Sequence, residues 1–212
     1  MNQNLLKTSA LAILLATAPF TAYAETAQEQ LAVSTQVART ETQETRVELQ
    51  KTIATLTTLQ AQTSGDLRPN FDKYSAAIDS TRTAANLTIK RLDTMTADSK
   101  NYFASWKSEL GSISNKDIRK TSQKRLQTVQ KEYAAVLAKM GLARTAFAPM
   151  LSDATDLRTA LGTDLTPNGL KSQKKAVSRS NKSLAAAQKP VVETLLAFDK
   201  LAKNLTPTGS KK

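Results

Sequence analysis

Residues 126–161, LQTVQKEYAAVLAKMGLARTAFAPMLSDATDLRTAL, place apolar side chains on a seven-residue grid through five repeats. One heptad position holds Leu126, Tyr133, Met140, Phe147, Ala154 and Leu161. The position three residues later holds Val129, Val136, Ala143, Met150 and Leu157. A spacing that alternates between three and four residues over this length predicts a long helix that packs along its whole length against other helices.

The rest of the chain reads as further helices separated by short turns. The predicted helices are 26–63, 69–110, a third that begins at Ser114 and contains the heptad segment, and 166–205. Helices joined by turns this short run antiparallel. Aromatic residues make up 5% of the 212 residues, which suits a thin core. The sequence therefore predicts an all-α fold, an elongated antiparallel up-and-down bundle of three to four long helices with coiled-coil-like packing, as one domain over residues 25–205.

Two helix starts carry clear signals. Ser114 is the expected cap of the third helix, with Asp117 three residues later as the acidic member of a capping box. Thr166 followed by Pro167 opens the fourth helix with a cap and a proline in its first turn. Pro149 and Pro190 fall inside predicted helices, where each removes a backbone hydrogen bond. The heptad register continues through both prolines, which favours kinks, with breaks as the alternative.

The first 24 residues have the pattern of a signal peptide. Lys7 precedes a short apolar run at residues 10–18, and Ala22 and Ala24 flank Tyr23 in the small-x-small arrangement of a cleavage site. An uncleaved anchor is the alternative, but the run is about half of the ~20 residues that span a bilayer. We therefore expect a soluble chain exported to the periplasm, with no transmembrane segment after cleavage. Residues 206–212 are expected to form a disordered basic tail.

The chain contains neither cysteine nor histidine. Disulfides, thiol nucleophiles, imidazole bases and the usual zinc, copper and haem ligands are therefore excluded. Only carboxylates remain for a metal, and no acidic loop of the D-x-D-x-D-G kind occurs. No serine lies in a G-x-S-x-G context, and no pair of carboxylates is marked out. We expect a protein that is not an enzyme, has no catalytic or metal site and needs no cofactor.

Positive charge is concentrated in the second half of the chain. Residues 25–100 carry a net charge of −1, and residues 101–212 carry +12. The first basic cluster, on the third helix, consists of Lys116, Arg119, Lys120, Lys124, Arg125 and Lys131. The second basic cluster, on the fourth helix, consists of Lys171, Lys174, Lys175, Arg179 and Lys182. Spacings of three and four put each cluster largely on one helical face, opposite the apolar seam.

The two basic clusters have two interpretations. Lysine-rich outer faces commonly serve only to keep rod-like proteins soluble. Alternatively, the clusters bind polyanions such as the anionic sugars, phosphates and lipid headgroups of the cell envelope. The clusters lie near helix starts, where the helix dipole does not favour cations. Nucleic acid is disfavoured as the partner, because no stacking aromatic residues are interleaved with the basic ones.

Several segments of the second and third helices resemble a family of bacterial proteins. They are WKSEL at 106–110, Arg119 to Ser122 with its R-x-x-S spacing, Tyr133, Met140 and the AFAPML segment at 146–151. The family is an uncharacterised one, known as a domain of unknown function, of exported coiled-coil proteins found mainly in Gram-negative species. The resemblance spans roughly residues 49–205 and implies an all-helical periplasmic or envelope protein. It implies no activity, cofactor or catalytic residue, and without a cysteine this chain has no lipoprotein anchor.

Three functions fit these observations. The first is a non-catalytic scaffold or interaction protein of the periplasm that binds an envelope protein, or a second copy of itself, through its helices. The second is an electrostatic binder of anionic envelope polymers or of the membrane surface, in peripheral contact, through the two basic clusters. The third is a holdase-like chaperone, which requires an open apolar cleft.

Overall fold

The computed structural model describes residues 19–205, with side chains from residue 26 onward. The predicted signal peptide up to residue 18 and the predicted tail 206–212 lie outside the described residues. The side chains of Ala22 and Ala24, the predicted cleavage residues, also lie outside them. The backbone of the first helix, which begins at Pro19, continues through this predicted cleavage site.

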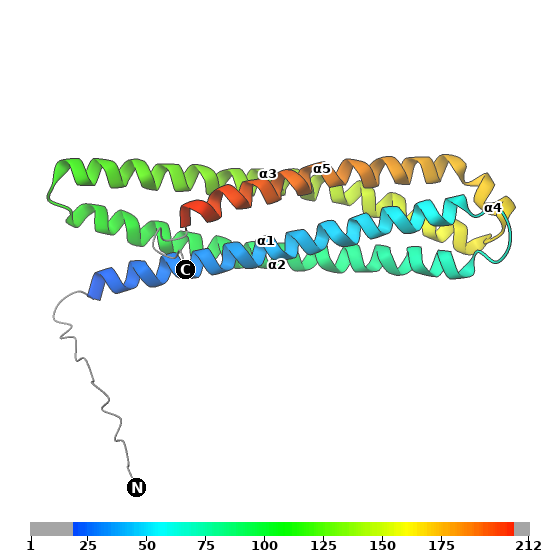
Figure 1. The fold of residues 1–212 in the computed structure, drawn as a ribbon, viewed down its shortest axis with the longest axis horizontal. Coiled ribbons are helices and arrows are strands. Elements are labelled where there is room, and N and C mark those ends of the chain that lie inside the picture. Colours follow the sequence, from blue (N-terminus) through cyan, green and yellow to red (C-terminus); the bar gives the residue numbers. More distant parts are fainter. Residues whose placement is uncertain (1–18, 206–212) are drawn as a thin grey trace, which may run out of the picture.

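Residues 19–205 fold into helices and contain no strand. The helices are α1 (Pro19–Ala61), α2 (Arg68–Ser112), α3 (Lys116–Thr163), α4 (Pro167–Ser172) and α5 (Lys174–Leu205). The four long helices run up and down in an elongated antiparallel bundle, and α4 is a short connection between α3 and α5 (Figure 1). The predicted all-α bundle is confirmed.

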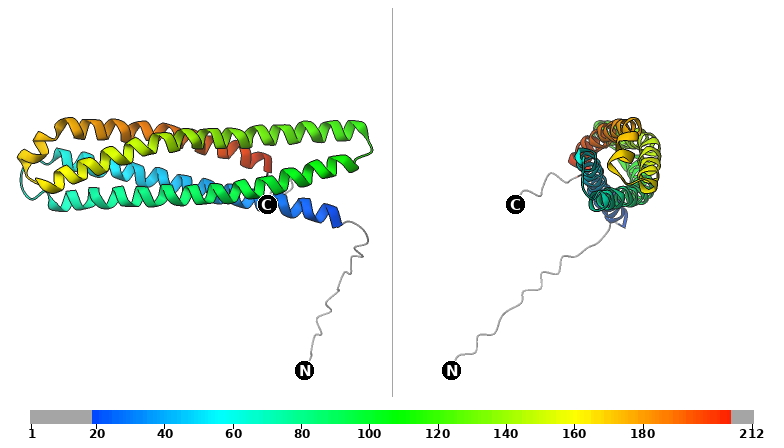
Figure 2. Two further views of the ribbon diagram at one scale, coloured as in Figure 1. Left: turned by 180° about the vertical axis from the view of Figure 1, so that it is seen from behind. Right: turned by 90° about the vertical axis from the view of Figure 1, so that its right-hand side faces the viewer.

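The long helices surround a common axis, as the end-on view shows (Figure 2). The most extensive contacts are between α1 and α2 and between α3 and α5, and α1 also packs against α5. The side between α2 and α3 has the fewest contacts of these four. Since α5 is shorter than α3, it ends before the α2–α3 turn, and that hairpin extends past it (Figure 1).

The heptad segment of α3 forms one wall of the core. Nine of its eleven grid residues are buried, and the other two, Tyr133 and Met140, are half-buried. The core divides into two clusters along the axis, one toward α4 that includes Tyr74 and Leu157, and one toward the α2–α3 turn that includes Met95. The apolar seam of α3 is therefore covered by helices of the same chain.

Threonines occupy several core positions between α1 and α2. Thr45 and Thr88 are joined through their hydroxyl groups at 2.9 Å, and Thr52 and Thr81 are joined in the same way at 2.9 Å. All four side chains are buried. Each hydroxyl has a partner, so burial does not leave it unsatisfied.

The start of α3 differs from the prediction. The cap is Asn115, whose side-chain oxygen accepts hydrogen bonds from the backbone N–H groups of Asp117 (3.0 Å) and Ile118 (3.1 Å). Ser114 is therefore not the cap, because the helix begins one residue later than expected. An amide oxygen at the residue directly before the helix meets the free N–H groups of the first turn, as the hydroxyl of Ser114 was expected to do.

The predicted fourth helix is two helices. Thr166 caps α4 by accepting the backbone N–H of Gly169 at 2.9 Å, as predicted, and Pro167 lies in the first turn. The helix is interrupted at Gln173, whose backbone N–H bonds to the carbonyl of Gly169 at 3.2 Å. The chain then resumes as α5 in a new direction.

The two internal prolines do not break their helices. Pro149 lies within α3 and Pro190 within α5, and both helices continue past them. The predicted alternative of breaks is wrong. Figures 1 and 2 show α3 changing course between its green and yellow sections, which lets it follow the curve of the bundle.

Candidate binding surface

The two basic clusters lie at opposite ends of the bundle. The first basic cluster occupies the first turns of α3, beside the α2–α3 turn, and the second occupies α4 and the first turns of α5. Because α3 and α5 are antiparallel, Lys139 of α3 meets Glu193 of α5. From that register, the centres of the clusters are separated by about 50 Å along the axis at 1.5 Å per residue. The structure therefore does not merge them into one patch.

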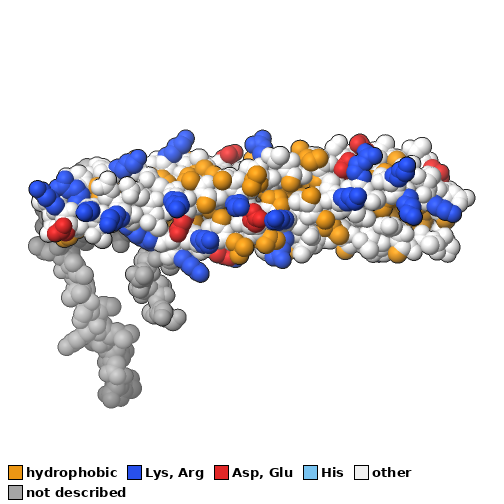
Figure 3. Space-filling model, turned by 90° about the horizontal axis from the view of Figure 1, so that it is seen from above, with side chains coloured by type: hydrophobic (Ala, Val, Ile, Leu, Met, Phe, Trp, Pro, Cys, Tyr) orange, Lys and Arg blue, Asp and Glu red, His pale blue; other side chains and the backbone are white. Residues whose placement is uncertain are grey.

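The clusters nevertheless belong to the same side of the rod. Helices α3 and α5 are neighbours, and every cluster residue is exposed. Seen from above, with the first half of α3 and the first half of α5 uppermost, basic side chains lie along the whole face, both ends included (Figure 3). A flat anionic surface on that side could meet both clusters at once.

Ten of the eleven cluster cations make no ion pair or hydrogen bond within the part of the chain that the structure describes. The exception is Arg125, which donates to the backbone carbonyl of Asn204 at 2.7 Å and to its side-chain oxygen. This contact ties the first cluster to the end of α5. The remaining cations have no partner that would explain their presence.

The cations that join helices to one another are different residues. The interhelical ion pairs are Arg39–Asp199 at 2.6 Å, Arg91–Glu41 at 3.5 Å, Lys139–Glu193 at 2.7 Å and Arg158–Asp79 at 2.9 Å. None of these cations belongs to a cluster. Within the described residues, the cations that form ion pairs between helices are therefore not the cations predicted to bind polyanions.

The second basic cluster borders a groove at its end of the bundle. Lys171 and Lys174 line it together with Gln60 and Gln62 from the end of α1 and with Asn168 of α4, around a volume of about 500 Å³. Two cations and three amide side chains line this groove beside the apolar Pro167, Leu170 and Val177, so an anionic group could meet the lysines at its edge. The lysines were identifiable from the sequence but the groove was not, because α1 lies more than a hundred residues away in the chain.

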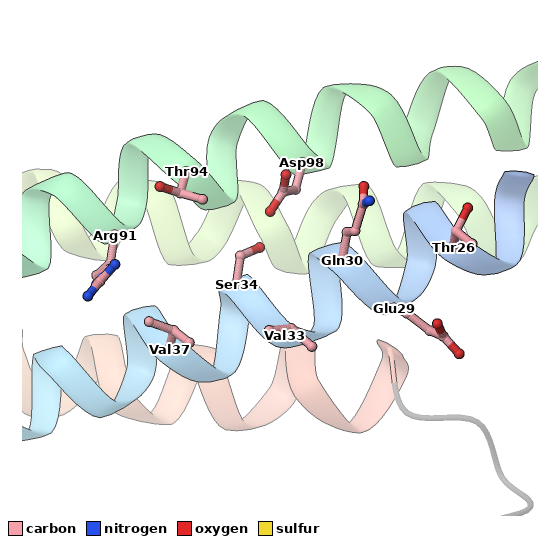
Figure 4. A pocket seen from close by; sticks show the side chains of 9 residues that line it. All are labelled: Thr26, Glu29, Gln30, Val33, Ser34, Val37, Arg91, Thr94 and Asp98. Atoms are coloured by element: carbon pink, nitrogen blue, oxygen red, sulfur yellow. The ribbon is translucent and has the colours of Figure 1, made fainter.

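A second groove runs between α1 and α2 near the start of α1, with a volume of about 490 Å³ (Figure 4). Val33 and Val37 of α1 line one wall, and Arg91, Thr94 and Asp98 of α2 line the other. Val33 is 64% exposed. This groove is open and partly apolar, so it can accept a side chain or a short apolar segment.

Among residues 19–205, no group of three or more His, Cys, Asp or Glu side chains could hold a metal ion. Burial raises the pKa of Tyr74 to about 12 and that of Tyr102 to about 12, which moves both phenols away from proton transfer at neutral pH. Desolvation also raises the pKa of Glu109, a single carboxylate near the α2–α3 turn.

The aromatic residues beside the first basic cluster serve packing. Trp106 donates a hydrogen bond from its indole nitrogen to the hydroxyl of Ser122 at 2.9 Å. The ring of Tyr102 lies 5.4 Å from that of Trp106, and Phe103 lies 5.6 Å from Tyr133 in an edge-on contact. These rings fill the thin end of the bundle and face one another.

The chain belongs to a family of proteins of unknown function, DUF2959, whose model matches residues 24–205. Membership of an uncharacterised family is thus confirmed. No curated protein and no solved structure matches the chain.

Proposed function

We propose that this member of DUF2959 is a non-catalytic binding protein of the bacterial envelope that attaches to anionic polymers or surfaces through its two basic clusters. The periplasmic location rests on the predicted signal peptide. The match to the family begins at residue 24, beside the predicted cleavage site, which supports that boundary. A Gram-negative source remains a prediction from the resemblance.

The observation that carries the proposal is the grouping of ten cations, unpaired within the described residues, into two clusters on neighbouring helices, since the unpaired lysines of α2 are spread along that helix. Exposed charges of one sign repel one another, and the helix dipole opposes the cations in the first turns of α3 and α5, such as Lys116 and Lys174, but not Lys171 in the last turn of α4. The chain holds other cations in ion pairs between helices, so pairing is available to this fold. Eight of the eleven cluster residues are lysines. Lysine is a flexible point charge, which suits arrays of phosphate or carboxylate groups without fixed geometry.

The experiment compares binding by two variants with the same loss of charge. The cluster variant carries Lys120→Gln, Lys124→Gln, Lys174→Gln and Lys175→Gln. The control variant carries Lys73→Gln, Lys90→Gln, Lys100→Gln and Lys107→Gln on α2, where all four lysines are exposed and make no ion pair. Both variants lower the net charge by four, so a difference between them reports position and not total charge.

Binding is measured by co-sedimentation with lipopolysaccharide, peptidoglycan and anionic vesicles. We expect the unmodified chain and the control variant to bind, and the cluster variant to lose most of its binding. We also expect binding to fall steeply between about 0.1 and 0.5 M salt, since these exposed charges are screened. Equal binding by the cluster and control variants would overturn the proposal.

The α1–α2 groove supports a second candidate, a scaffold that binds another protein. Val33, Val37 and Val47 leave apolar surface exposed on α1. A partner held there should stay bound in high salt and be lost on Val33→Ser with Val37→Ser. Binding lost in salt but unaffected by these changes would exclude the candidate. The holdase function remains a prediction, and the closed core of the described bundle offers it no added support.

A further inference from the structure

The middle of α3 is apolar but only partly used by the core. Residues 134–151 form a window whose length and composition fit a membrane-spanning helix, and 22% of that window is buried inside the bundle. Among residues 19–205, α3 is the one helix that meets this test. Half of its apolar side chains, among them Ala138 and Leu142, are exposed, and the other half are buried in the core or packed against it.

The outward residues of this window lie on one side of α3. Ala138, Leu142 and Pro149 are exposed. Their spacings of four and seven residues place them along one helical face. Leu142 is the largest of them and is 55% exposed. This row lies opposite the buried seam that contains Val136 and Ala143.

Helix α5 extends the same apolar surface. Ala186 is exposed and Pro190 is half-buried, close to the level where Lys139 of α3 meets Glu193 of α5 at 2.7 Å. Lys189, whose side chain is 84% exposed, also lies 4.0 Å from Glu193, so the middle of the face keeps a net positive charge beside its apolar side chains. Figure 3 shows hydrophobic side chains along this middle region, interspersed with basic and acidic ones.

We propose that the face made by the two basic clusters and the apolar middle lies flat on a bilayer that contains anionic lipids. This inference rests on the proposed function and names one partner for it. The lysines at each end meet lipid phosphates, which attract basic side chains close to such a surface. Leu142 and its small neighbours enter the headgroup region, as the apolar side of a surface-lying helix does.

The face fits a flat surface better than a single polymer strand. Its clusters are about 50 Å apart along the axis, so a plane contacts both at once and each contact raises the effective concentration of the other. A soluble polyanion gains nothing from the apolar middle. A spanning arrangement of α3 would expose its buried seam residues, including Val129 and Val136, at the expense of the core. The bundle therefore contacts the bilayer without crossing it.

The test uses the full chain and single-cysteine probes, which the cysteine-free sequence permits. Ala138→Cys on the face and Val33→Cys on α1 each carry an environment-sensitive fluorophore. On vesicles of phosphatidylcholine with phosphatidylglycerol, we expect a blue shift at position 138 and none at position 33. On inorganic polyphosphate, a soluble polyanion, we expect neither probe to shift although the protein binds.

The affinity measurement compares Leu142→Gln with the matched change Val33→Gln. We expect Leu142→Gln to weaken vesicle binding roughly fivefold, as for the loss of about half of a leucine's apolar burial, with no effect on polyphosphate binding. Val33→Gln should leave both unchanged. Vesicle binding without a shift at 138 and without an effect of Leu142→Gln overturns this inference while the proposed function stands. Failure to bind vesicles, polyphosphate and envelope polymers alike overturns the proposed function itself.

Discussion

Neutralising the first basic cluster should stabilise the fold. The variant carries Lys116→Gln, Lys120→Gln and Lys124→Gln, three exposed positions at the start of α3 that make no ion pair in the described structure. Lysine and glutamine have similar helix propensities, so the backbone is little affected. What changes is the repulsion among the cations and their interaction with the helix end.

The magnitude follows from the spacing. Lys116 with Lys120 and Lys120 with Lys124 are like charges four residues apart, each pair destabilising by about 0.2–0.5 kcal/mol. Lys116 also occupies the first position of α3, where a cation opposes the dipole at a cost of about 0.3–1 kcal/mol. Relief of all three effects should raise the free energy of unfolding by roughly 1 kcal/mol at low ionic strength, and by less at high salt.

The assay is urea unfolding followed by circular dichroism at 222 nm, at neutral pH and two salt concentrations. Lys139→Gln is the control, because it removes the 2.7 Å pair with Glu193 and should destabilise the protein. A triple variant less stable than the unmodified chain would refute the reasoning. The three lysines would then have a structural role, and the argument that they are kept for binding would fail.

Three further predictions concern stability. Burial raises the pKa of Tyr74 from 10 to about 12, so the stability that its neutral phenol contributes is full below pH 10 and declines as pH rises toward 12. In urea titrations, the unmodified chain should lose about 2 kcal/mol more than Tyr74→Phe between pH 9 and 11.5. Equal losses would contradict this prediction. The hydrogen bond and charge of Lys139 hold the pKa of Glu193 below 4.5, so the stability that the Glu193 carboxylate contributes is full above that pH and is lost on acidification. In an acid titration, Glu193→Gln should therefore lose less stability than the unmodified chain. Thr45→Val leaves the buried hydroxyl of Thr88 without its partner and should lower the free energy of unfolding by about 1–3 kcal/mol. The double variant Thr45→Val with Thr88→Val should recover most of that loss. A double variant no more stable than the single one would show that packing dominates.

The helical layout was largely predictable because it follows from periodicity and turn residues. The predicted first helix ends at 63 and the observed one at Ala61, and the predicted second begins at 69 and the observed one at Arg68. Gly65, with a φ of 79°, makes the turn between them in the left-handed region that glycine favours. These signals are local, so one sequence suffices to read them.

The predictions that differ from the structure, the cap of α3 and the unbroken fourth helix, lie where local signals compete or are missing. Ser114 and Asn115 are both good caps, and their order in the chain does not say which one the helix selects. The interruption at Gln173 has no proline or glycine at that position to mark it. The core threonines of α1 resemble an exposed polar face, because their burial depends on partners such as Thr81 and Thr88 in another helix. Tertiary pairing decides all of these.

The candidate site divides in the same way. The eleven basic residues were identifiable by composition and spacing, but three observations that give them meaning are three-dimensional. Sequence does not show that ten cations lack partners, that the two clusters share one side of the rod, or that the apolar window of α3 lies between them. Each of these depends on the antiparallel register of α3 and α5, which the contact of Lys139 with Glu193 records.

The two basic clusters and the exposed leucine between them are unfavourable for the isolated protein and favourable for a protein bound to an anionic surface. This difference favours a binding function. Unpaired cations at helix starts lower stability, and an exposed leucine such as Leu142 gains nothing from water. An anionic bilayer would offset both penalties together, since phosphates pair with the lysines while the headgroup region accepts the leucine. A face needed only for solubility gains nothing from an exposed leucine and small apolar side chains among its charged ones. The pattern therefore fits a surface that meets a partner having both properties.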